Sequence, residues 1–190
     1  IDRSDIRQKH KPLEKSYGNT QVLTKDYTIR AEIEVVIREI AEQVAARLRS
    51  HQSQAGCVSL MVGYSMAEGE KGFSRQVKIP FTNQTKEIVR HCMFLFDTHY
   101  KGQAVRNLGV SCSKLKEDST MQLDLFKKVE NQVNEQKLDE IVDTVRAKYG
   151  FGSLVHASSL MSGATAIKRN STLIGGHASG RNEKDVKQIQ

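Results

Sequence analysis

The side chains that could carry chemistry are few and far apart in this sequence. Cys57, Cys92 and Cys112 stand in apolar patterns, and no two of them have the spacing of metal ligands. His91 and His99 fall two turns apart on one helix, and no cysteine or carboxylate completes a ligand set. We therefore expect buried free thiols in a reducing cytoplasm and surface histidines, with no catalytic site, no metal site and no cofactor.

Two neighbouring segments instead predict a surface for binding. Residues 57–65 and 72–80 alternate apolar and polar side chains around a charged connection, which indicates a β-hairpin that ends at Pro80. One face of this hairpin carries small hydroxyl and amide side chains and one lysine. Such a face lets another molecule's backbone approach closely and offers hydrogen bonds, although it is equally typical of a solvated sheet.

Helix and strand patterns around the hairpin give the order strand, helix, strand, strand, helix, strand. We expect an edge strand over 15–23, a helix over 28–50, a second helix that opens at Thr82 or Asn83, and a last strand over 104–114. The fold class is α+β: a ferredoxin-like βαββαβ domain with a four-stranded antiparallel sheet and two helices on one face. The last strand again turns small polar residues outward, so the open sheet face is predicted to be polar.

Charge narrows the class of partner. The 190 residues carry a net charge of +7 and a pI of about 9.3, which favours an anionic partner such as nucleic acid. The outward face lacks the stacking aromatic residues of an RNA-recognition motif, so contact with the phosphates of a duplex is the better hypothesis. The sequence holds no apolar run long enough for a membrane span, and we expect a cytoplasmic protein.

Four stretches together resemble the little-finger domain of the Y-family translesion DNA polymerases. This is the DinB/UmuC (ImpB/MucB/SamB) family, and the tail resembles its Gram-positive UmuC/UvrX-like branch. The stretches are residues 15–19, 72–80, 82–86 and 105–111. The resemblance covers about residues 1–118 and implies that 1–14 link to the polymerase core and that 15–118 grip template–primer DNA.

The same resemblance implies a set of DNA-binding residues on the sheet. They are Ser16, Gly18, Ser74, Arg75, Gln76, Lys78, Arg106, Asn107 and Ser111. Strict alternation, however, places Arg75 and Arg106 on the apolar side of their strands. Either a bulge re-aims these two arginines or they lie at the margin of the sheet.

By resemblance, the parent protein polymerises DNA with Mg²⁺ held in a palm domain that this chain lacks. No expected strand presents the two or three acidic residues that two-metal nucleotidyl transfer requires. The chain on its own is therefore expected to incorporate no nucleotide.

Beyond residue 118 the composition changes. A short motif within residues 119–133 matches the pentapeptide by which bacterial polymerases hold the β sliding clamp, and its residues are Gln122, Leu123, Asp124, Leu125 and Phe126. Leu125 and Phe126 could fill an apolar pocket, and Gln122 could fix the register by hydrogen bonds. The alternative is that the motif is only the start of an amphipathic helix.

The last part of the chain, residues 134–190, is expected to hold one helix and a basic, partly disordered tail. The helix spans 134–149, with an apolar face made by Leu138, Ile141, Val142, Val145 and Tyr149. Neither the partner of that face nor an oligomeric state follows from the sequence. A competing hypothesis for the whole chain is a protein-interaction module whose open sheet binds another subunit.

Overall fold

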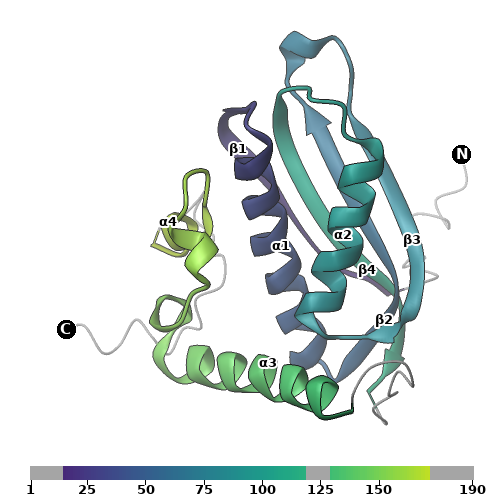
Figure 1. The fold of residues 1–190 in the computed structure, drawn as a ribbon, viewed down its shortest axis with the longest axis vertical. Coiled ribbons are helices and arrows are strands. Elements are labelled where there is room, and N and C mark those ends of the chain that lie inside the picture. The colour runs from purple at the N-terminus through teal and green to yellow at the C-terminus, as the bar shows by residue number, and fades with distance from the viewer. Residues whose placement is uncertain (1–14, 119–128, 172–190) are drawn as a thin grey trace, which may run out of the picture.

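Four strands and two helices form the body of the protein in the predicted order. The structure, a computed structural model, describes residues 15–118 and 129–171. The elements of the body are β1 (Tyr17–Tyr27), α1 (Arg30–Ser50), β2 (Ser53–Tyr64), β3 (Phe73–Thr82), α2 (Thr85–His99) and β4 (Val105–Glu117). All strand pairs are antiparallel in the order β1-β4-β2-β3, and α1 and α2 cover one face (Figure 1). The α+β, ferredoxin-like fold and the edge position of β1 are thus confirmed.

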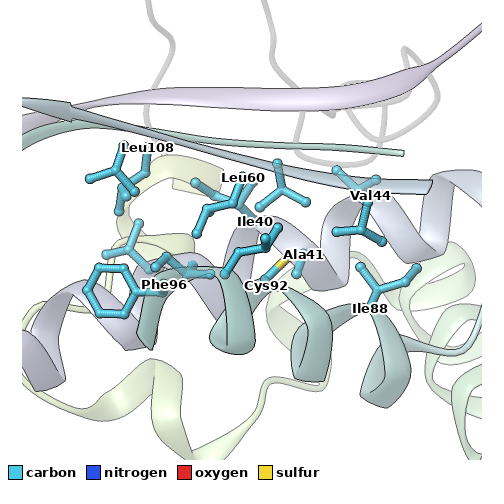
Figure 2. Close-up of a cluster of buried hydrophobic side chains, with 14 of the residues drawn as sticks. Ile40, Ala41, Val44, Leu60, Ile88, Cys92, Phe96 and Leu108 are labelled. Carbon is cyan, nitrogen blue, oxygen red and sulfur yellow. The ribbon is translucent and has the colours of Figure 1, made fainter. Parts of the chain in front are cut away.

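The core lies between the sheet and the two helices. The α1 residues that recur at three- and four-residue steps, such as Ile40 and Val44, are fully buried. They pack against Ile88, Cys92 and Phe96 of α2, and the side chains of Leu60 and Leu108 point into the same layer from the sheet (Figure 2). Because every other strand residue enters this layer, the remaining residues must face away from the helices.

The prediction that the second strand of the hairpin ends at Pro80 is wrong. β3 continues through Pro80 to Thr82, and its register with β2 shifts between the Ala55 and Cys57 pairs. A proline without an N–H is tolerated at an edge strand or an irregular register. β3 is an edge strand because of the order of all four strands, and this order cannot be inferred from residues 72–80 alone.

The predicted start of α2 at Thr82 or Asn83 is also wrong. The N-cap is Gln84, which makes no side-chain cap bond. The Thr85 N–H instead donates to the Asp139 carboxylate, with an N–O distance of 2.9 Å, so a residue far along the chain satisfies the first turn. Asn83 is buried, and its amide donates to Asp118 rather than capping the helix.

The rest of the described chain packs against the helix layer. It contains α3 (Val129–Tyr149), two short 3-10 helices, η3 (Phe151–Ser153) and η4 (Ala157–Leu160), and α4 (Ala166–Ser171). α3 crosses the ends of α1 and α2, and α4 lies beside α1 (Figure 1). α3 begins at Val129, five residues before the expected start at residue 134.

Three glutamates of α1 hold residues 150–171 in place. Glu32 accepts a hydrogen bond from the Ser162 hydroxyl, and Glu42 lies 3.2 Å from the His156 Nε2 atom besides pairing with Arg146 of α3 at 2.7 Å. Glu39 accepts from the backbone N–H groups of Thr165 and Ala166 at 2.9 and 3.0 Å. This segment is therefore more regular than the expected loop, because buried carboxylates satisfy its donors. None of the helices in the described ranges is long and apolar enough to cross a membrane.

Candidate nucleic-acid interface

The face of the sheet that points away from α1 and α2, here called the open face, carries a row of small polar residues across all four strands. Cross-strand partners share a face, and the register pairs Gly18 with Ser111, Ser111 with Ser59, and Ser59 with Gln76. Each of these residues alternates with a core residue of its own strand. The row presents hydroxyl and amide groups with little bulk.

The register brings most of the predicted DNA-binding residues together on this open face. Ser74 stands opposite Met61, Lys78 opposite Cys57, and Asn107 opposite Gly63. Ser16 is exposed directly before β1. The set on the open face is Gly18, Ser74, Gln76, Lys78, Asn107 and Ser111.

Arg75 does not belong to this set. It pairs with Leu60, which is fully buried under the helices, and the register is regular on both sides of it. Its side chain thus leaves the sheet on the helix side of the edge strand, where it is exposed and donates to the Ser74 carbonyl oxygen at 2.9 Å. Of the two alternatives left by the sequence, a position at the sheet margin holds for Arg75.

The other alternative, a bulge, holds for Arg106. The register of β4 shifts between Val105 and Asn107 against both neighbouring strands, so Arg106 lies in the irregular stretch. Its guanidinium pairs with Asp26 at 3.3 Å, and both side chains are about 40% exposed (42% and 40%). Asp26 also accepts a hydrogen bond from Ser65 at 2.6 Å.

Glycines on the open face leave no gaps, because neighbouring side chains fold over them. A Cβ at Gly63 would lie 2.9 Å from the Asn107 Cβ, and one at Gly109 would lie 3.0 Å from the Thr20 hydroxyl. Sequence reasoning missed Thr20, although its place two residues after Gly18 on an alternating strand puts it on this face. The glycines therefore set how closely the outer side chains of adjacent strands pack.

Replacing Gly63 with alanine is expected to lower the free energy of unfolding by about 1 to 3 kcal/mol, since the new methyl group would overpack against Asn107. Urea unfolding measures the loss. The matched control is Gly152→Ala, whose Cβ meets no atom within 4 Å and should cost almost nothing. Equal stability of the two variants would show that this part of the face is loosely packed.

The open face offers hydrogen bonds and charge but no evident covalent chemistry. Burial raises the pKa of the Cys112 thiol in the core to about 12, and nearby Cys57 adds to the rise, so Cys112 supplies no reactive thiolate at neutral pH. Burial likewise raises the pKa of Cys92. Within the described residues, no group of three or more histidine, cysteine or carboxylate side chains is placed to hold a metal ion.

A ferredoxin-like sheet with both helices on one side and a polar free face defines a binding platform. Comparison with known proteins gives the family: residues 14–125 match the model of the impB/mucB/samB family C-terminal domain, and the chain belongs to that family. This confirms the resemblance found in the sequence.

Individual relatives extend the similarity beyond that domain. The protein called UvrX of Bacillus subtilis, named for UV-damage repair, is 38% identical over 180 residues, which are 94% of this chain and 42% of UvrX. DNA polymerase IV 2 of the same organism is 31% identical over 179 residues, covering 93% of this chain and 42% of that protein. The chain thus spans less than half the length of these relatives.

One solved structure also matches the chain, at low sequence identity. It is the little finger domain of PolIV in complex with the beta-clamp processivity factor, with a TM-score of 0.44 and 15% identity, covering 60% of this chain and 100% of that chain.

Proposed function

We propose that this chain is the DNA-gripping C-terminal part of an error-prone translesion DNA polymerase and that its open face lies along the backbone of template–primer DNA. The observation that carries the proposal is the uninterrupted polar row from Gly18 through Ser111 and Ser59 to Gln76. Hydroxyl and amide groups on this face suit phosphate and sugar contacts, which position a duplex without reading its sequence. The family membership and the net charge of +7 support it.

Charge would come from residues around that row. Lys78 lies on the open face and is exposed, so it can pair with a phosphate directly. Among the residues that the structure describes, Arg106 is held by an exposed ion pair with Asp26 alone. Such pairs contribute little, so the guanidinium can exchange Asp26 for a phosphate. Arg75 would add positive charge at the sheet margin and would not contact the DNA from the polar row itself.

The test is binding of the chain to duplex DNA as a function of salt. Affinity should fall steeply with added salt, and Lys78→Ala should weaken binding to all duplexes alike and reduce the salt slope by about 0.9, the value for one lost phosphate contact. The matched control is Lys86→Ala on α2, an exposed lysine in the opposite layer. A strong preference for one DNA sequence, or an equal effect of Lys86→Ala, would contradict the proposal.

A second part of the proposal concerns the sliding clamp. Residues 122–126 lie outside the described residues, between β4 and α3. The chain just before them is fixed, because the Asp118 N–H donates to Gln52 and its carboxylate accepts from Gln54 and Asn83. We expect the segment to bind the clamp without disturbing the open face. Mg²⁺-dependent synthesis would belong to a separate catalytic part of the polymerase.

A further inference from the structure

The apolar face of α3 is not the face through which the helix docks. Ion pairs of Glu135, Asp139, Asp143 and Arg146 attach α3 to the body. The neighbouring stripe of Leu138, Ile141, Val145 and Tyr149 is here called the α3 stripe. Leu138 is 60%, Ile141 57% and Tyr149 66% exposed, and Val145 is half-buried. An amphipathic helix that buries its charges and exposes its apolar side leaves a surface for another molecule.

The α3 stripe runs into a groove of about 780 Å³ that α1, α2, α3 and η4 enclose. The apolar part of its lining comes from Val89, Met93 and Phe94 of α2 and from Leu138. Phe94 is 56% exposed, although it is among the largest apolar side chains of α2. Leu138 thus belongs to both the groove and the stripe, and the groove lies on the helix side of the sheet, away from the open face.

The charges that line the groove are unevenly satisfied. Four of the five lining carboxylates form ion pairs: Glu42 with Arg146, Asp97 with Arg30, Glu135 with Lys86, and Asp139 with Arg49. Glu39 accepts from the N–H groups of Thr165 and Ala166 through one oxygen, and its other, buried oxygen has no hydrogen-bond partner in the part of the chain that the structure describes. Arg38 is exposed in the same lining and has no ion-pair or hydrogen-bond partner among the residues that the structure describes. Lys86 and Arg90 belong to the same lining, are exposed, and form surface ion pairs with Glu135 and Glu87, which are weak. The groove therefore complements a ligand that brings apolar groups and carboxylates.

We propose that this groove and the α3 stripe form a docking site for an acidic amphipathic helix of a partner protein. The surface is elongated, since Leu138 and Tyr149 are about 16 Å apart along the helix axis at a rise of 1.5 Å per residue. That length matches three turns of a helix whose anchors recur every three or four residues, and it exceeds what a small molecule would cover. The site is separate from the open face and does not depend on the proposed DNA contacts.

Two synthetic helical peptides of about 16 residues, or roughly four turns, would test the proposal. Both carry the same leucine face, and the polar face is glutamate-rich in one and lysine-rich in the other. Titration of the 190-residue chain should show that the glutamate-rich peptide binds at least about tenfold more tightly, because Arg38, Lys86 and Arg90 line the site. Leu138→Asp and Phe94→Asp should each weaken it about tenfold or more, and Arg38→Glu should remove the preference for the acidic peptide.

The matched control is Met66→Asp, which places the same charge at a fully exposed residue of the hairpin connection and should change nothing. Leu138 and Phe94 are themselves exposed, so these variants should fold, which circular dichroism verifies. Equal binding of both peptides, retained binding by Leu138→Asp, or no binding up to about 1 mM would overturn the proposal. Self-association of the chain that Leu138→Asp abolishes in sedimentation would overturn it too and assign the groove to a second copy.

Discussion

Replacing Leu125 and Phe126 together with alanine is expected to abolish binding of the chain to the bacterial sliding clamp and to leave DNA binding unchanged. An extended peptide must become ordered on binding, at a cost of about 1 to 2 kcal/mol per residue, so its affinity has to come from a few well-buried anchors. These two residues are the only adjacent bulky apolar pair in the segment. Truncating an anchor costs about 2 kcal/mol or more, so the pair should account for roughly a thousandfold in affinity.

Calorimetric titration with the clamp of the same organism measures this effect. The matched control is the double replacement of Leu160 and Met161 with alanine, an adjacent apolar pair whose side chains are 74% and 58% exposed. That variant should bind the clamp as tightly as the unaltered chain. If the Leu125 and Phe126 variant bound equally well, residues 122–126 would serve only to connect β4 and α3.

Local patterns were sufficient to predict the elements of the body. The apolar stripe of α1 and the alternation in β2, β3 and β4 each depend on side chains within one element, because burial against a single neighbouring layer imposes the period. Predicted polar residues such as Ser111 and Gln76 fall on the open face for the same reason. Their common row follows from strand register, which one strand alone does not specify.

Features that depend on contacts far apart in the sequence were not predictable. Asp139 accepts a hydrogen bond from the first turn of α2 although it lies 54 residues further along the chain. The N-cap predicted at Thr82 or Asn83 is therefore not the one that the helix has. The bulge that re-aims Arg106 lies where β4 meets Tyr27 and Tyr64 of two other strands. Glu39 shows only as a charged helix residue in the sequence, yet it is 3% exposed beneath the chain around Ala166.

The α3 stripe shows a different limit of sequence patterns. Periodicity correctly groups Leu138, Val145 and Tyr149 on one side of a helix, but it does not tell whether that side is covered. α3 packs against the body through its charged side, because the Arg49 guanidinium of α1 donates hydrogen bonds to both Asp139 and Asp143, which lie one turn apart on α3. An apolar face thus indicates where a helix can be buried, and the partner decides whether it is.

Replacing Arg49 with alanine is expected to lower the free energy of unfolding by about 3 kcal/mol and to release α3 from the body. The Arg49 side chain is only 10% exposed and pairs with Asp143 at 2.6 Å and Asp139 at 3.1 Å. It also donates to the Asn83 carbonyl oxygen at 2.8 Å and to the Thr85 hydroxyl at 3.1 Å. Removing one partner of such a network leaves partly buried charges without compensation, which is costly.

Urea unfolding gives the stability, and hydrogen exchange should show α3 losing protection before β2 and β4 do. Arg30→Ala is the control, because Arg30 is 50% exposed and its ion pairs should contribute less than about 1 kcal/mol. A loss of stability no larger for Arg49→Ala than for Arg30→Ala would mean that other contacts hold α3.

Since Leu138 of α3 forms one wall of the groove, release of the helix should also remove binding of the glutamate-rich peptide. DNA binding should persist in the same variant, because the open face lies on the other side of the sheet and shares no residue with this network.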